Sequence, residues 1–249
     1  MSKPVDLHLE HWGPASGAPR ALLLHGITSS GATMWQLGEG LAEHGWSVTA
    51  PDLRGHGRSP RAGSYRRGEL AGDVLALGTG WDLVVGHSLG GAVTVLALDR
   101  DPAFAQRAVL LDPALRVPAD LVGPLASEML DEIAQADAAT YRRAHPAWPD
   151  RTIQTRVQAH RSVAPEAITA ILTADLPWDH TEQAARITVP VHVIAADPDL
   201  DPSFTAAQGR ELQQRNPGWT WEIAPGAAHS VHRDAPDLVI DRLLGSQLR

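Results

Sequence analysis

A serine flanked by glycines stands where an apolar run meets a helix-compatible segment. The segment reads Leu83-Val84-Val85-Gly86-His87-Ser88-Leu89-Gly90-Gly91. A very sharp strand-to-helix turn tolerates no side chains two positions before and after its central residue, and Gly86 and Gly90 meet that requirement. Such a turn exposes the central hydroxyl and aims the first helical amides at it. The pattern predicts Ser88 as a nucleophile and the Leu89 amide as an oxyanion donor.

A second apolar run, residues 21–24, ends in His25-Gly26 before a polar loop. Gly26 permits a tight turn, so the amide of Ile27 can point at the same reaction centre as a second oxyanion donor. We interpret His25 as structural, with its imidazole holding the loop backbone through hydrogen bonds rather than transferring a proton.

A serine hydroxyl is a poor nucleophile at neutral pH and needs a base within hydrogen-bond reach. The chain has 12 histidines. His229 follows the apolar run 221–224 and therefore falls on a loop at the sheet edge that also holds Ser88. It is the predicted base, and His232, three residues further on, is the alternative.

A carboxylate must orient that base. Three aspartates follow the apolar run 191–195, namely Asp197, Asp199 and Asp201. Asp199 lies three residues after Ala196, a position from which its carboxylate can reach His229, and it is the predicted acid. Asp197 and Asp112 remain alternatives, and the last of the three aspartates fits a cap for the following turn.

Short apolar runs with helix-length spacers must position these groups. The runs cover residues 5–9, 21–24, 46–50, 83–85, 108–111, 191–195 and 221–224. The middle runs are continuously apolar, as in strands buried on both faces of a parallel sheet, whereas residues 5–9 alternate like an antiparallel edge strand. This rhythm predicts an α/β fold with a mostly parallel sheet flanked by helices.

The rhythm breaks between residues 113 and 186. Helical patterns at 121–133, 153–162 and 166–172 are separated by prolines, with no strand-like run among them. We expect a core of residues 1–112 and 187–249, with residues 113–186 inserted as a helical cap.

Large apolar side chains in the cap and after His25 are candidates to line a substrate pocket. These are Met34, Trp35, Trp148 and Trp178. Hydrophobic packing between cap and core is the alternative for each tryptophan.

Composition excludes several classes of function. The 249 residues include no cysteine and carry a formal net charge of −8. A cysteine nucleophile and thiolate metal sites are excluded, and no histidine pair has metal-ligand spacing. The negative charge disfavours nucleic acid and anionic membranes as partners, and no segment approaches the roughly 20 apolar residues of a membrane span.

The first residues lack the apolar stretch of a secretory signal, so a soluble, cytoplasmic protein is expected. One basic cluster, formed by Arg54, Arg58, Arg61, Arg66 and Arg67, is interpreted as solvated loop residues. No cofactor or metal is expected, and the sequence leaves the oligomeric state open.

Taken together, these motifs resemble the α/β-hydrolase superfamily, particularly its small capped esterases and lactonases. The resemblance rests on His25-Gly26, Asp52-Leu53-Arg54-Gly55-His56-Gly57-Arg58-Ser59, Gly86-His87-Ser88-Leu89-Gly90-Gly91, Asp199 and Gly226-Ala227-Ala228-His229. It implies an eight-stranded sheet whose first two strands lie at one edge, with a cap over the site. Ala196 departs from the glycine that family members usually carry there. Epoxide hydrolases and haloalkane dehalogenases place aspartate at the elbow, so Ser88 argues against both.

The expected reaction is hydrolysis of a small-molecule carboxylic ester or lactone through an acyl-enzyme on Ser88. Carbon–carbon bond cleavage, amide hydrolysis or perhydrolysis on the same three side chains are alternatives. A ligand receptor that keeps these residues but turns over slowly is another.

Overall fold

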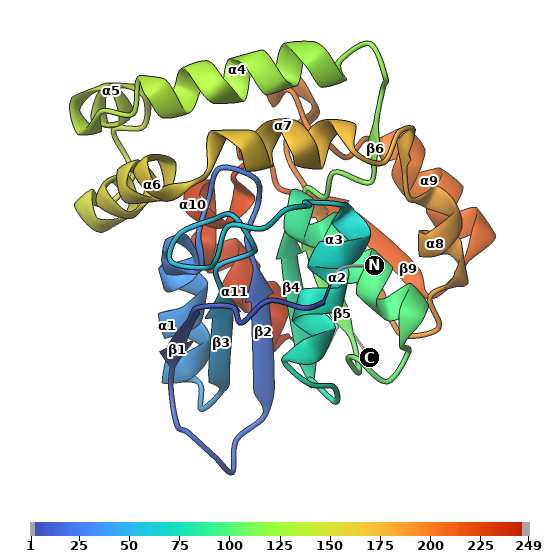
Figure 1. Ribbon diagram of the computed structural model, residues 1–249. Helices are drawn as coiled ribbons and strands as arrows, with labels where there is room; N and C mark the ends of the chain where they lie inside the picture. Colours follow the sequence, from blue (N-terminus) through green and yellow to red (C-terminus); the bar gives the residue numbers. More distant parts are fainter. Residues whose placement is uncertain (1–2, 246–249) are drawn as a thin grey trace.

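The computed structural model describes residues 3–245, and within them seven strands form one sheet (Figure 1). Its order is β1-β3-β2-β4-β5-β8-β9, with β1 antiparallel to β3 and every other neighbouring pair parallel. The strands are β1 (Leu9–Trp12), β2 (Arg20–Leu24), β3 (Ser47–Pro51), β4 (Leu83–His87), β5 (Ala108–Leu111), β8 (Val191–Ala195) and β9 (Trp219–Ile223). The predicted mostly parallel α/β sheet is confirmed.

The beginning of the sheet differs from the sequence prediction. The amide of Val5 donates to Oδ1 of Asp73 at 2.9 Å, and the amide of His8 donates to Oγ of Ser59 at 2.8 Å. The amides of Val5 and His8 thus bond to side chains instead of to a neighbouring strand. The carbonyl of His8 accepts the amide of Asp52 at 2.8 Å, but the edge strand itself begins only at β1. The expectation of eight strands is therefore wrong for the described residues, whose main sheet has seven.

Helices cover both faces of the sheet because side chains alternate between faces along each strand. Helices α1 and α11 pack over the face that includes Leu23 and Val85, whereas α2, α3 and α9 pack over the face that includes Leu22 and Val84. The helices of this part of the chain are η1 (Gly31–Met34), α1 (Trp35–Glu43), α2 (Arg67–Ala76), α3 (Leu89–Arg100), η2 (Pro198–Leu200), α9 (Ala206–Arg215), α10 (Val231–Asp234) and α11 (Pro236–Leu244).

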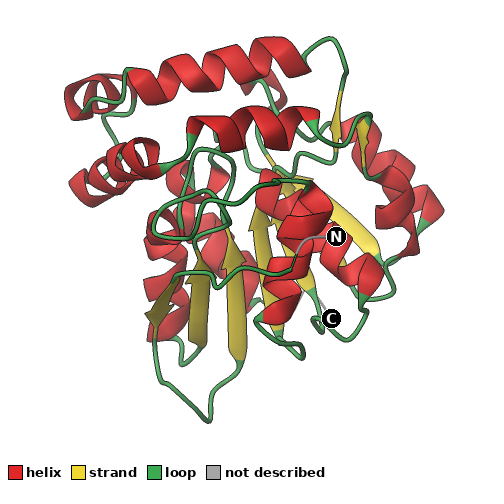
Figure 2. Ribbon diagram, viewed as in Figure 1, coloured by secondary structure: helices red, strands yellow, loops and turns green. Residues whose placement is uncertain are grey.

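The segment between β5 and β8 is helical apart from one short strand pair (Figure 2). It contains β6 (Arg116–Val117), α4 (Val122–Ala134), α5 (Ala138–Ala144), α6 (Asp150–Ser162), α7 (Pro165–Thr173), β7 (Trp178–Asp179) and α8 (Thr181–Arg186). Helices α4 to α7 lie across one end of the sheet (Figure 1). We propose that residues 113–186 are a cap over the core formed by residues 1–112 and 187–249.

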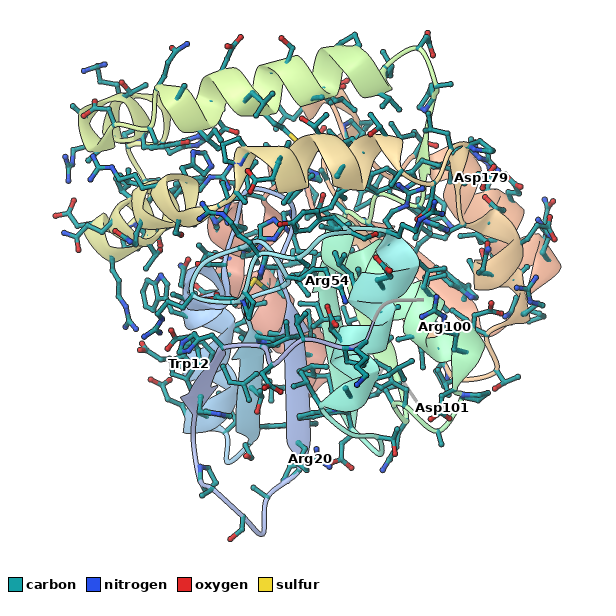
Figure 3. The ribbon with its side chains drawn as sticks, viewed as in Figure 1. Trp12, Arg20, Arg54, Arg100, Asp101 and Asp179 are labelled. Carbon is teal, nitrogen blue, oxygen red and sulfur yellow. The ribbon has the colours of Figure 1, made fainter. Side chains whose placement is uncertain are left out.

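Two arginines of the basic cluster are buried, contrary to their interpretation as solvated residues. Arg54 lies in the interior (Figure 3), and its Nε and a terminal nitrogen donate to the two carboxylate oxygens of Asp73 at 2.6 and 2.7 Å. Arg67 donates to the carbonyl of Ile171 at 2.7 Å and lies over the ring of Trp178. These buried cations tie α2 to the loop after β3 and to the cap.

Within residues 3–245, none of the helices combines the length and the apolar character that crossing a bilayer requires.

The buried ion pair gives a stability prediction. Asp73→Asn replaces the carboxylate that binds Arg54 with a neutral amide, and we expect the free energy of unfolding to fall by about 3 kcal/mol. The buried cation loses the carboxylate that it contacts at 2.6 and 2.7 Å and keeps Glu69, which lies farther away at 3.4 Å. Urea denaturation measures this change. Glu182→Gln removes an exposed partner of Arg215 and should leave the denaturation midpoint unchanged. Equal effects of the two substitutions would contradict the assignment.

Candidate active site

Ser88 stands at the turn from β4 into α3 with φ 52° and ψ −115°, a conformation that side-chain-bearing residues rarely adopt. A Cβ on Gly90 would lie 2.2 Å from the carbonyl oxygen of Leu24, and one on Gly86 would lie 2.5 Å from the carbonyl oxygen of Gly90. No side chain fits at either glycine, so the sharp turn that their spacing predicts is present. It presents Ser88 to a cavity at this edge of the sheet.

Two backbone amides border the same cavity. Leu89 is the first residue of α3, and amides in the first turn of a helix have no intrahelical acceptor. Ile27 also lines the cavity, and its amide donates no hydrogen bond to any group in residues 3–245. Both predicted oxyanion donors therefore lie beside Ser88 with their N–H groups available.

His25 holds the loop that carries Ile27. Its Nε2 accepts the amide of Leu53 at 2.9 Å, so its Nδ1 carries the proton and donates to the carbonyl of Gly26 at 2.8 Å. Burial lowers the pKa of His25 to about 4, which keeps the ring neutral. These contacts fit the structural role expected from the sequence.

His229 faces the cavity and binds a carboxylate through its far ring nitrogen. Its Nδ1 donates to Oδ2 of Asp112 at 2.6 Å, which leaves Nε2 as a proton acceptor. Asp112 follows β5 directly and is fully buried. Its carboxylate also accepts backbone amides at 2.8 to 3.2 Å, those of Ala196, Ser203 and Phe204. A buried charge requires such compensation.

The structure contradicts Asp199 as the partner of His229, because Asp112 occupies that place. Helix η2 turns the loop after β8 outward, so Asp199 is exposed. The alternative Asp197 is engaged elsewhere, since its carboxylate accepts the amides of Asp199 at 3.0 Å and Gly226 at 2.7 Å. The loop after β8 contributes amide donors to the carboxylate of Asp112, which follows the neighbouring strand β5.

Two further histidine rings lie close to this arrangement: the ring of His87 is 4.8 Å from that of His229 and 4.6 Å from that of His232. Nε2 of His87 donates to the carbonyl of His229 at 2.9 Å and so holds the backbone of that loop. His232, the alternative base, is buried, and its ring nitrogens have no partner among the described residues. Burial, with other cationic groups nearby, places the pKa of both rings well below the usual value.

The cavity beside Ser88 has a volume of about 370 Å³ and lies between core and cap. Of the four predicted pocket residues, Trp178 lines it, with its Nε1 donating to the carbonyl of Ala114 at 2.7 Å. The prediction is wrong for the other three. Met34 packs into the core beneath α1, Trp35 begins that helix outside the cavity, and Trp148 lines a separate, shallower hollow.

Charged residues that were not among the four predicted pocket residues also line the cavity. They are Glu128, Glu132, Arg156, Asp201 and Arg233. No local pattern in the sequence indicates that these five side chains face the cavity. Among residues 3–245, no group of three or more His, Cys, Asp or Glu side chains is placed to hold a metal ion.

Buried neutral histidines make stability depend on pH. An unfolded chain protonates His25 near pH 6.5, whereas the folded protein resists this until about pH 4. The contribution of His25 to the free energy of unfolding should therefore be complete above pH 6.5 and decrease on acidification. Between pH 7 and pH 5 this contribution should fall by roughly 2 kcal/mol. Urea denaturation at the two pH values measures the change, and equal stabilities would contradict a buried neutral ring.

Known proteins are similar to this chain in sequence and in fold. Residues 21–242 match the alpha/beta hydrolase family. Lipase LipV of Mycobacterium tuberculosis is 38% identical over 152 residues, which make up 59% of this chain and 57% of the lipase. The match thus spans little more than half of that relative.

Two other proteins match over most of their length. 2-(acetamidomethylene)succinate hydrolase of Mesorhizobium japonicum is 25% identical over 89% of this chain and 85% of that protein. The enol-lactonase of Burkholderia xenovorans LB400 superimposes with a TM-score of 0.81 at 25% identity, covering 96% of this chain and 95% of that chain. The family and these relatives indicate a hydrolase. Because the family match extends over residues 21–242, the chain belongs to the α/β-hydrolase family.

Proposed function

We propose that this protein is a serine hydrolase that cleaves a carboxylic ester or lactone through an acyl-enzyme on Ser88. One observation carries the proposal: His229 lines the cavity that holds Ser88 and donates its Nδ1 proton to the buried carboxylate of Asp112 at 2.6 Å. In this proposal Ser88 is the nucleophile, His229 the base and Asp112 the group that orients the base.

In the proposed reaction, Oγ of Ser88 attacks the substrate carbonyl while Nε2 of His229 takes its proton. The amides of Ile27 and Leu89 donate to the oxyanion of the tetrahedral intermediate. His229 then returns the proton to the leaving group, and a water molecule activated in the same way hydrolyses the acyl-enzyme.

Asp112 is the proposed acid of this triad. Its carboxylate fixes the tautomer of His229 and stabilises the imidazolium that forms as Ser88 attacks. Because three backbone amides also donate to this carboxylate, it cannot turn away from the ring without breaking buried hydrogen bonds.

The proposed substrate is a small molecule. A volume of about 370 Å³ lies within the range of small-molecule sites, and Met129, Leu172 and Trp178 supply apolar contact area around Ser88. The similarity to proteins named as a lipase and an enol-lactonase supports an ester or lactone bond.

Ser88 is the proposed nucleophile, and its substitution tests the reaction. The wild-type protein should release product from short p-nitrophenyl esters or from lactones well beyond one equivalent, and Ser88→Ala should lower kcat at least about 10³-fold. A fluorophosphonate should add once, at Ser88, as mass spectrometry of the labelled peptide would reveal. Inactivity toward every ester and lactone would contradict the proposed ester or lactone hydrolysis. Cleavage of only amides or β-diketones would favour other chemistry on the same residues, and release of a single equivalent would favour a receptor.

Two substitutions separate the candidate acids Asp112 and Asp199. Asp112→Asn should lower kcat about 10³- to 10⁴-fold, because an amide in this position favours the wrong tautomer of His229. Asp199→Asn is the matched control and should retain activity within about twofold, since its side chain is exposed. Circular dichroism checks that both variants fold. A large loss in the Asp199 variant with a small loss in the Asp112 variant would reverse the assignment.

A further inference from the structure

Arg233 is a buried cation in the wall of the cavity that holds Ser88. It is 4% exposed, and its terminal nitrogens donate to Oγ of Ser230 at 2.9 Å and Oγ of Ser29 at 3.1 Å. Its Nε–H has no acceptor within residues 3–245, and no carboxylate of that range lies within 4 Å of its guanidinium. A buried charge without a counter-ion is costly, so this residue is poorly explained by stability alone.

The two carboxylates that act electrostatically on Arg233, Asp234 and Glu132, are engaged with other groups. Asp234 accepts Nε1 of Trp148 at 2.7 Å and the amide of Ala228 at 3.0 Å. Glu132 accepts a guanidinium nitrogen of Arg156 at 3.0 Å. Burial, followed by repulsion from Arg156, lowers the pKa of Arg233 to about 9, which leaves it protonated at neutral pH. The cavity therefore contains a positive charge that no carboxylate of residues 3–245 pairs within 4 Å.

Hydrogen bonds fix where this charge lies. Thr33 donates to the carbonyl of Ser30 at 2.7 Å, so its Oγ1 accepts the hydroxyl of Ser29 at 2.6 Å. Oγ of Ser29 is then left to accept Arg233. The guanidinium is thereby held between the loop that carries the Ile27 amide and the residue that follows His229.

A second cation reaches the cavity from the cap. Arg156, on α6, lines it and donates to the carbonyl of Thr28 at 3.1 Å. Arg156 has Glu132 as its counter-ion. Arg233, in contrast, has no carboxylate partner among the described residues. Glu128 and Asp201 also line the cavity, so an anionic ligand is favoured at the Arg233 end and not throughout.

We propose, resting on the hydrolase function above, that Arg233 binds a carboxylate carried by the substrate. The substrate class is then a half-ester or lactone with a free carboxylate beyond the scissile carbonyl. A planar guanidinium forms charge-assisted hydrogen bonds with a carboxylate, which would orient the carbonyl toward Ser88.

The test compares two substrates of equal shape, monoethyl succinate and its neutral isostere ethyl succinamate, by the rate of ethanol release. The wild-type protein should prefer the charged ester by about 10- to 100-fold in kcat/KM, and Arg233→Gln should abolish most of that preference. Arg151→Gln is the matched control. Arg151 lies on the same cap helix as Arg156, pairs with Glu39 outside the cavity, and should leave both rates unchanged.

Binding to Ser88→Ala provides a readout that does not depend on turnover. Calorimetry should detect succinate binding and no binding of succinamide, and Arg233→Gln in the same background should weaken succinate binding about tenfold or more. If Arg233→Gln does not fold, Arg233→Lys replaces it, and its ammonium should weaken succinate binding several-fold because it cannot reproduce the forked contact.

The outcomes distinguish the two proposals. Equal rates on both esters, with no succinate binding, would overturn the carboxylate site while leaving the hydrolase function intact. Hydrolysis of neither ester, with Ser88 unlabelled by a fluorophosphonate, would overturn the hydrolase function, and succinate binding would still decide the anion site.

Discussion

The buried carboxylate of Asp112 organises the candidate site. It receives three backbone amides and Nδ1 of His229, so it joins the end of β5 to the loops that follow β8 and β9. A buried charge of this kind is stable only while every donor stays in place. The requirement fixes the loop that carries His229 relative to the end of β5.

The strained turn at Ser88 depends on the same rigidity. The contacts around Gly86 and Gly90 leave no room for a side chain at either position, and the buried helix α3 follows the turn directly. Two histidine side chains hold the neighbouring loops through hydrogen bonds. His25 binds the carbonyl of Gly26 in the loop that carries Ile27, and His87 binds the carbonyl of His229. A strained backbone conformation of this kind persists where contacts with the surrounding structure hold the residue in place, and it is typical of functional sites.

Local features of the site were predictable from the sequence, and features that depend on distant packing were not. The sharp turn at Ser88 and the placement of Ile27, Leu89 and His229 around one cavity follow from short motifs next to apolar strands. Six of the seven predicted strands lie within two residues of their expected positions. The carboxylate that binds His229 was misassigned because counting from the end of β8 cannot reveal the outward turn of η2. Buried arginines such as Arg233 resemble surface arginines in sequence, and the tryptophans gave no sign of which side chain would face the cavity.

The charges in the cavity and the proposed chemistry fit one another. A cation held beside the oxyanion loop would bind the far end of an acidic substrate, and the apolar wall around Trp178 would cover its middle. The crystal structure of a phosphonate adduct on Ser88 tests the central claim most directly. The phosphonyl oxygen should lie about 3 Å from the amides of Ile27 and Leu89, with His229 still bound to Asp112. An adduct whose oxygen points away from both amides, or a His229 paired with Asp199, would contradict the account.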